Sequence, residues 1–324
     1  MTTIQDDNRY DLTGARGTRG RWGDWSLMGV SGAATVLTVL TFGMIVWKIV
    51  DQAHPAVGKF GLGFLSGSTW NAVNDQYGAR DFIFGTAVTS LFALLIATPI
   101  AIAIGLFLAD LSPKALRSPV GAMVETLAGV PSVLIGLWGI IVLGPIVRDD
   151  FAPVLASVLG WTPFFSEPAF GYTGSSMLSA VIVLVIMVVP IVSSVSRELF
   201  TRVPREVQDG ALALGATRWE TIQKVTIPYV GPGLLAASVL GLGRAIGEAI
   251  AVTQVIGVTT HGLSLNFFNT GDTLASRIAG QFQGAASNLQ IAALFYLALI
   301  LLVLSVMFNM VALVIIRRVE RKRG

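Results

Sequence analysis

PREVQDGALALGATRWETIQKVTIP, residues 204–228, lies between two long apolar segments of the chain. Pro204 can open a helix, because the N–H that proline lacks has no partner in a first helical turn. Apolar residues then recur at helical spacing, first as Val207, Ala211 and Leu214 and then as Trp219, Ile222 and Val225. Gly215, between the two series, permits a sharp bend or a left-handed cap. The stretch predicts two short helices that meet at a glycine and end at Pro228, where the next apolar segment begins.

Apolar segments dominate the chain on both sides of this stretch. Of its 324 residues, 53% are hydrophobic and 13% are charged, whereas soluble domains have about 25% charged residues. Six segments contain the roughly 20 mostly apolar residues that a helix needs to cross a bilayer. They lie near 27–50, 82–109, 120–147, 176–196, 230–257 and 289–316. The composition therefore predicts an all-α, polytopic membrane bundle of six transmembrane helices, with a two-helix loop at 204–228.

The positions of the basic residues set the expected orientation. Arginine and lysine concentrate in residues 1–25, in the second and fourth loops, and after the last apolar segment. The alternating loops hold only Lys59, Arg80, Arg148 and Arg277. Because cytoplasmic loops carry an excess of basic residues, we expect both termini and the 204–228 loop in the cytoplasm. Residues 1–25 are then a polar tail and residues 26–324 a membrane domain, whose loop protrudes as a knob or lies as a ledge on the bilayer.

The residue content excludes several kinds of site. The chain has no cysteine, and His54 and His261 are its only histidines, so we expect no thiol catalysis, no metal site and no cofactor. An intramembrane hydrolase is disfavoured, since neither histidine lies well inside an apolar segment. No G-x-x-x-x-G-K-[ST] phosphate loop occurs, so the chain is not expected to bind or hydrolyse ATP by that mechanism.

Charged residues inside apolar segments mark candidate sites, because a charge at mid-bilayer costs about 3 to 10 or more kcal/mol. Arg244 and Glu248 are four residues apart in the fifth segment, and we expect them to share one helix face with Gly241. Such a pair can neutralise itself and hold the bundle in register. Glu125 lies near the cytoplasmic start of the third segment, where a capping or interfacial role is as well supported as gating.

The 204–228 loop resembles the EAA loop of permease subunits in bacterial ABC importers, whose core reads G-x9-I-x-L-P. The matching positions are Gly215, Ala216, Val225, Ile227 and Pro228. Asp209, Gly210 and Ala211 stand where the family has Glu-Ala-Ala, and Gly210 weakens the helix by up to about 1 kcal/mol relative to alanine. The resemblance implies that this loop docks on an ATPase subunit. The implied coupling residues are Glu206, Asp209, Ala211, Gly215, Ala216 and Pro228.

Three further stretches narrow the family. They are YGARDFIFGTAVTS from Tyr77, ETLAGVPSVLIGLWG from Glu125 and GLGRAIGEAIAVTQVIG from Gly241. Together they resemble the phosphate-specific permeases of the PstC type. The resemblance implies an inorganic phosphate permease subunit of an ATP-driven ABC importer in the bacterial inner membrane. The implied partners are a second permease of the PstA type, two ATP-binding subunits that hydrolyse ATP, and an external phosphate-binding protein.

The same resemblance implies that the intramembrane pair matters for translocation. A guanidinium matches phosphate oxygens in a fork geometry, and Glu248 could orient Arg244 or accept a proton from hydrogen phosphate, which sulfate lacks. We hypothesise that Arg244, Glu248 and Gly241 line the substrate path. Arginine alone does not separate phosphate from sulfate, molybdate or phosphonate. A secondary transporter or channel would also explain the charges, but such proteins more often show inverted repeats, and none is visible in the sequence.

Overall fold

The computed structural model describes residues 18–168, 171–258 and 264–321. The chain separates into two units, residues 1–51 and residues 52–324. Most of the tail predicted at 1–25 lies outside the described residues, and from Thr18 onward the chain is helical. In the first unit, the hydroxyls of Thr35, Thr38 and Thr41 each donate to the carbonyl four residues earlier. These threonines are therefore compatible with an apolar surrounding.

The described chain is helical almost throughout. Its α-helices are α1 (Thr18–Phe60), α2 (Gly63–Ser66), α3 (Arg80–Leu106), α4 (Lys114–Ala128), α5 (Ser132–Trp138), α6 (Gly144–Ile146), α7 (Ala152–Leu159), α8 (Met177–Thr201), α9 (Arg205–Ala213), α10 (Arg218–Thr221), α11 (Ile227–Gly247), α12 (Ile250–Val255), α13 (Leu274–Gln281) and α14 (Asn288–Arg321). The π-helical turns are η1 (Phe107–Leu111), η2 (Gly139–Leu143), η3 (Val147–Phe151) and η4 (Ile222–Thr226), and η5 (Phe282–Gly284) is a 3₁₀ turn. Strands β1 (Trp70–Asn71) and β2 (Gln76–Tyr77) form an antiparallel hairpin.

Six helical runs of the described chain are long and apolar enough to cross a membrane, which confirms the predicted number and order. They are Trp25–Phe60, Arg80–Leu111, Ser132–Leu159, Met177–Thr201, Arg218–Gly247 and Asn288–Arg318. The third run is displaced from the predicted 120–147, because α4 ends at Ala128 and a new helix begins only at Ser132. Pro131 explains the break, since the residue before a proline is disfavoured in helical conformation.

Helices α3 and α8 form the centre of the second unit, where they pack along most of their length. One face of α3 carries a row of small buried residues, Ala93, Ala97, Ala101 and Gly105. Helix α8 buries the aliphatic side chains of Val183, Leu184, Val188 and Val192, and its Ser193 and Ser196 lie against Gly105 of α3. Small residues let membrane helices approach closely and form many van der Waals contacts. These contacts drive helix association in a bilayer, where the hydrophobic effect does not, because lipid tails are themselves apolar. This seam is the scaffold on which α11 and α4 also pack.

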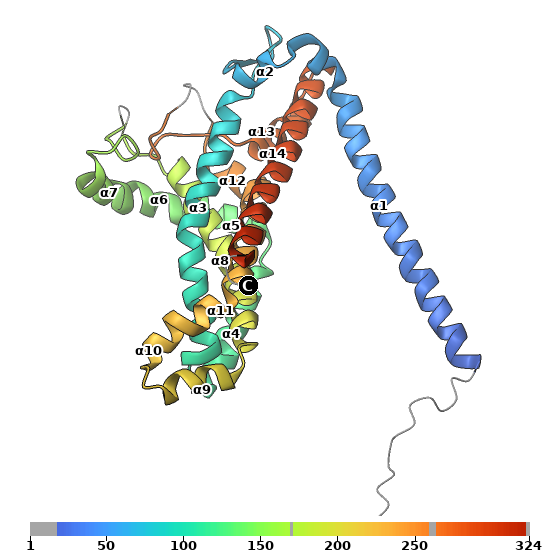
Figure 1. Cartoon of the computed structure of the whole chain (residues 1–324). Helices are drawn as coiled ribbons and strands as arrows, with labels where there is room; N and C mark the ends of the chain where they lie inside the picture. Colours follow the sequence, from blue (N-terminus) through green and yellow to red (C-terminus); the bar gives the residue numbers. More distant parts are fainter. Residues whose placement is uncertain (1–17, 169–170, 259–263, 322–324) are drawn as a thin grey trace, which may run out of the picture. The chain divides into compact units, whose positions relative to one another are not determined.

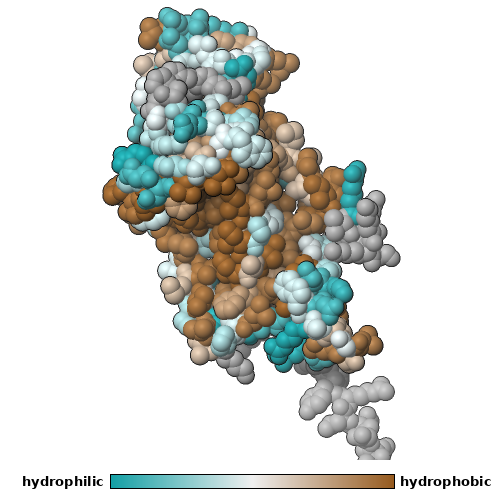
Figure 2. All heavy atoms as spheres, turned by 90° about the vertical axis from the view of Figure 1, so that its left-hand side faces the viewer, coloured by the Kyte–Doolittle hydropathy of each residue, from teal (hydrophilic) through white to brown (hydrophobic). Residues whose placement is uncertain are grey.

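The two ends of the second unit carry different elements. Helices α9 and α10 lie at one end, whereas α2 and α13 lie toward the opposite end (Figure 1). The face drawn in Figure 2 is apolar along its middle and hydrophilic toward both ends. This distribution is typical of a protein surface that spans the hydrocarbon core of a bilayer.

Candidate functional site

The fifth membrane-length helix is broken at the predicted charged pair. Helix α11 ends at Gly247, and Glu248 has an extended backbone with φ −74° and ψ 113°. Helix α12 begins two residues later, at Ile250. The single segment predicted over 230–257 is therefore two helices, joined at Glu248.

Arg244 and Glu248 are brought together as an ion pair. Nη2 of Arg244 lies 3.1 Å from Oε2 of Glu248. The other carboxylate oxygen, Oε1, accepts a hydrogen bond of 3.2 Å from the N–H of Ala251 in α12. The Glu248 side chain is only 4% exposed, whereas that of Arg244 is 45% exposed. The buried Glu248 carboxylate thus binds both the guanidinium of Arg244 and the start of α12. Arg244 is the member of the pair that is exposed enough to contact a ligand.

The surroundings of Arg244 separate the nearby glycines into two groups. Gly243 and Gly247 are exposed, and a Cβ at either position would meet no atom within 4 Å. Gly241, in contrast, is buried: its Cβ would lie 2.7 Å from Cγ2 of Val192 on α8. Gly241 therefore lies at the contact between α11 and α8, and does not share the exposed face with Arg244. Residues three positions apart point about 60° away from each other around a helix, so one can contact α8 while the other stays at the surface.

The 204–228 loop begins as its sequence predicts. Helix α9 starts directly after Pro204, and Gly215 adopts the left-handed conformation, with φ 88°. The next helix, α10, begins with a capping box, in which the side chains of Thr217 and Glu220 each accept a hydrogen bond from the other residue's backbone N–H. The glycine and the capping box together make a tight corner between α9 and α10.

The second half of the loop continues into the membrane-length helix. Helix α10 passes through the π-helical turn η4 into α11, so that Arg218–Gly247 is one helical run. Pro228 therefore lies inside this run and does not end the stretch as predicted. A proline ring clashes with the carbonyl four residues earlier in a regular α-helix, and the wider η4 turn directly before Pro228 changes that spacing.

The loop exposes most of its side chains. Helix α9 buries none of its side chains, and Glu206 and Asp209 are exposed. Leu214 is 91% exposed and Trp219 is 62% exposed. Ala211 and Ala216 are partly buried. Large exposed apolar side chains rimmed by charges are typical of a surface that another protein covers.

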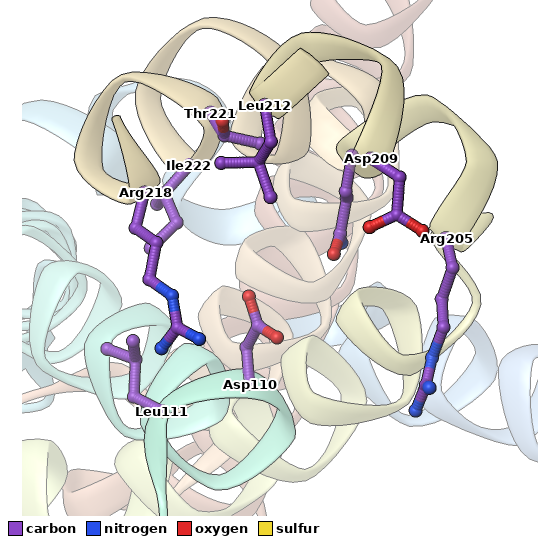
Figure 3. Close-up of a pocket in the computed structure, with 9 residues that line it drawn as sticks. Asp110, Leu111, Arg205, Asp209, Leu212, Arg218, Thr221 and Ile222 are labelled. Carbon is purple, nitrogen blue, oxygen red and sulfur yellow. The ribbon is translucent and has the colours of Figure 1, made fainter. Parts of the chain in front are cut away.

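A polar cavity of about 310 Å³ lies between this loop and the end of α3. Asp110 of η1, Asp209 of α9 and Arg218 of α10 line it, together with Leu212 and Ile222. Figure 3 shows the carboxylate of Asp110 and the guanidinium of Arg218 directed into the space. The lining thus combines acidic, basic and apolar side chains from the loop and from the end of α3.

Glu125 lies on α4, before the third membrane-length run begins at Ser132. Its carboxylate is exposed and forms an ion pair of 3.2 Å with Nη1 of Arg197, at the end of α8. Glu125 thus lies outside the membrane-length runs, and its ion pair joins the end of α4 to the end of α8. Within the described part of the chain, no group of three or more histidine or acidic side chains is placed to hold a metal ion.

Comparison with known proteins agrees with this architecture. Residues 101–322 match the family described as binding-protein-dependent transport system inner membrane component. The phosphate transport system permease protein PstC of Pasteurella multocida (strain Pm70) is 39% identical over 281 residues, which cover 86% of this chain and 87% of that protein. The protein of the same name from Mesorhizobium japonicum is 36% identical over 273 residues, with 83% and 82% coverage.

Solved structures share the fold at low sequence identity. A bacterial alginate ABC transporter, solved with an alginate-bound periplasmic protein, has a chain that superposes with a TM-score of 0.60 and 16% identity. The match covers 92% of this chain and 97% of that chain. An inward-facing MetNI methionine ABC transporter matches with a TM-score of 0.50 and 17% identity, over 75% of this chain and 94% of that chain.

Proposed function

The chain belongs to the family of inner-membrane components of binding-protein-dependent transport systems, and we propose that it is the permease subunit that forms half of the phosphate path in an ATP-driven importer. The observation that carries this proposal is the half-exposed side chain of Arg244, which forms an ion pair with the buried Glu248. It occurs in a chain that is 36% and 39% identical to two phosphate permeases.

The chemistry of the pair suits a phosphate ion in transit. The guanidinium of Arg244 presents planar, permanently charged donors that fit two phosphate oxygens. Glu248 already forms an ion pair with the guanidinium of Arg244. Arg244 therefore binds phosphate more weakly than an unpaired arginine would, and the phosphate can be released. The carboxylate also disfavours a fully deprotonated oxyanion beside it, and it can accept a hydrogen bond from the hydroxyl of hydrogen phosphate. Arg244 therefore attracts the anion, and Glu248 limits how tightly it is held.

Energy reaches this subunit through the 204–228 loop. The sequence has no phosphate loop for ATP, so a separate subunit hydrolyses ATP. The exposed residues Glu206, Asp209, Leu214 and Trp219 form the contact with that subunit. Ala211, Ala216, Gly215 and Pro228 shape the loop for docking. Because α10 is continuous with α11, a movement of the loop acts directly on the helix that carries Arg244.

A second permease, of the PstA type, completes the path. The stripe Gly243, Arg244 and Gly247 on α11 is exposed within the described part of residues 52–324, and small residues at i and i+4 allow close helix approach in membranes. The second subunit covers this stripe and leaves Arg244 facing the path between the two. The excess of basic residues places both termini and the loop in the cytoplasm, so the hairpin end faces the external phosphate-binding protein.

The proposed substrate is tested by uptake of labelled phosphate beside labelled sulfate. Cells that lack the gene are compared with the same cells after the gene is restored. Loss and recovery of phosphate uptake alone supports the proposal. If uptake of sulfate, molybdate or phosphonate follows the gene instead, the importer assignment stands and the phosphate assignment fails. Transport that persists without any ATPase subunit would indicate a secondary transporter or channel.

A further inference from the structure

Helix α13 lies toward the end of the second unit opposite α9 (Figure 1). Its Arg277 forms a buried ion pair with Asp272, which lies two residues before the helix begins. Nη2 of Arg277 lies 2.6 Å from Oδ2 of Asp272, and each side chain is 8% exposed. Oδ1 of Asp272 accepts hydrogen bonds from the N–H of Thr273 at 3.0 Å and from the hydroxyl of Ser276 at 2.5 Å. Burial raises the pKa of the Asp272 carboxyl, and Arg277 and these hydrogen bonds oppose the rise. The pair is thus fixed in a site shielded from water.

One side of this ion pair rests on the start of α3. The guanidinium carbon of Arg277 lies 4.6 Å from the ring centroid of Phe82 and 5.8 Å from that of Trp70 in the hairpin. A guanidinium over an aromatic face is attracted by the ring quadrupole, most strongly where water is excluded. The N–H of Leu274 donates to Oγ1 of Thr86 at 2.9 Å. Arg277 therefore holds α13 against α3 and the hairpin.

The other side of α13 contacts α12. Oγ1 of Thr253 donates to the carbonyl of Ala249 at 2.6 Å, and it also lies 3.3 Å from the carbonyl of Ser276 in α13. A Cβ at Gly280 would lie 3.4 Å from Cγ2 of Thr253, so the two helices are in van der Waals contact there. Helix α12 begins two residues after Glu248 and is bonded to the Glu248 carboxylate through Ala251. The position of α13 thus sets the position of α12, and α12 sets that of Glu248.

We propose that Arg277 is a positioning residue for transport. By pairing with Asp272 and stacking on Phe82, it holds α13 and α12 in place and keeps Glu248 aligned with Arg244. The burial of Arg277 separates this role from direct contact with the transported ion. The inference rests on the proposed phosphate import, since Glu248 and Arg244 act in that path.

The test uses a disulfide that replaces the function of Arg277. The chain has no cysteine, so Thr253→Cys with Gly280→Cys can link α12 to α13 without competing thiols. Arg277→Gln is expected to lower phosphate uptake per assembled complex about tenfold or more, because small misplacements of a site are costly. Oxidation of the cysteine pair in the Arg277→Gln chain is expected to restore most of the uptake, and reduction to remove it again. Arg277→Lys, which keeps the charge but loses the stacked plane, should fall between the two.

Two results would overturn the proposal: unchanged uptake by Arg277→Gln, or a loss that the disulfide does not restore at equal amounts of complex. If the Arg277→Gln chain does not accumulate in cells, the proposal is tested with Thr253→Cys and Gly280→Cys in a chain that keeps Arg277. Full uptake after oxidation supports a fixed α12–α13 contact, and loss of uptake shows that the helices separate during transport, which contradicts it. A parent chain without phosphate uptake would refute the proposed function, so the two failures are distinct.

Discussion

Arg244 is the side chain whose replacement tests the substrate path most directly. Arg244→Gln removes the charged fork and leaves Glu248 bonded to Ala251. A hydrogen bond to a charged group contributes about 1.5–3 kcal/mol, so we expect phosphate uptake per assembled complex to fall roughly 10- to 100-fold. Arg80→Gln, at a half-exposed arginine that is ion-paired with Asp81, is the matched control and should transport as the parent does. Equal uptake by both variants would remove Arg244 from the path.

The glycines of α11 predict opposite effects for the same substitution. Gly241→Ala places a methyl group 2.7 Å from Val192, and overpacking of this kind costs about 1–3 kcal/mol of folding free energy. Gly243→Ala brings its methyl group within 4 Å of no described atom outside its own helix, and alanine favours a helix over glycine by up to about 1 kcal/mol, so the stability of the isolated subunit should not fall. It should instead weaken association with the second permease. Thermal unfolding of the purified subunit and co-purification of the partner measure the two effects, and similar results for both variants would contradict the assignment of the faces.

At the scale of single elements, the corner between α9 and α10 should act in partner binding and not in folding. Leu214→Ala removes a side chain that is 91% exposed, so the thermal stability of the subunit should stay within about 0.5 kcal/mol of the parent. The ATPase subunit should co-purify in smaller amounts, and phosphate uptake should fall with it. Leu62→Ala, another exposed leucine beside α2 at the other end, serves as the control. Full retention of the ATPase subunit by Leu214→Ala would place the docking surface elsewhere.

Elements whose ends depend on local chemistry could be predicted from the sequence, and those whose ends depend on distant contacts could not. Pro204 and Gly215 fix the start and the corner of the loop through their own backbone preferences. The break at Glu248 was missed because a four-residue charge spacing favours an uninterrupted helix. It is stabilised by the Glu248 carboxylate, which bonds to both Arg244 and Ala251. The ion pair between Asp272 and Arg277 also depends on tertiary contacts with Phe82.

At the scale of the whole molecule, the predicted orientation can be read with introduced cysteines. The native chain contains none, so each variant carries a single thiol. Val73→Cys, at the exposed tip of the β1–β2 hairpin, should react with a membrane-impermeant thiol reagent in intact cells. Glu206→Cys, on α9, should react only after the membrane is opened, because the excess of basic residues predicts that this loop is cytoplasmic. Labelling in the reverse pattern would invert the topology, and with it the side on which the ATPase docks.

The continuous helical run Arg218–Gly247 can transmit a movement of the loop along α11 as a rigid rod. Its 30 residues correspond to a rod of about 45 Å, at 1.5 Å per residue. A sideways shift of ~2 Å at the loop end, typical of helix movements at interfaces, tilts such a rod by roughly 3°. The rod ends one residue before Glu248, at the point where the chain changes direction. With Glu248 as the pivot, such a tilt moves the loop end most and shifts Arg244, about one helical turn from the pivot, by only about 0.3 Å. A small stroke at the loop end therefore swings α10 and the start of α11 while the ion pair at the pivot stays closed.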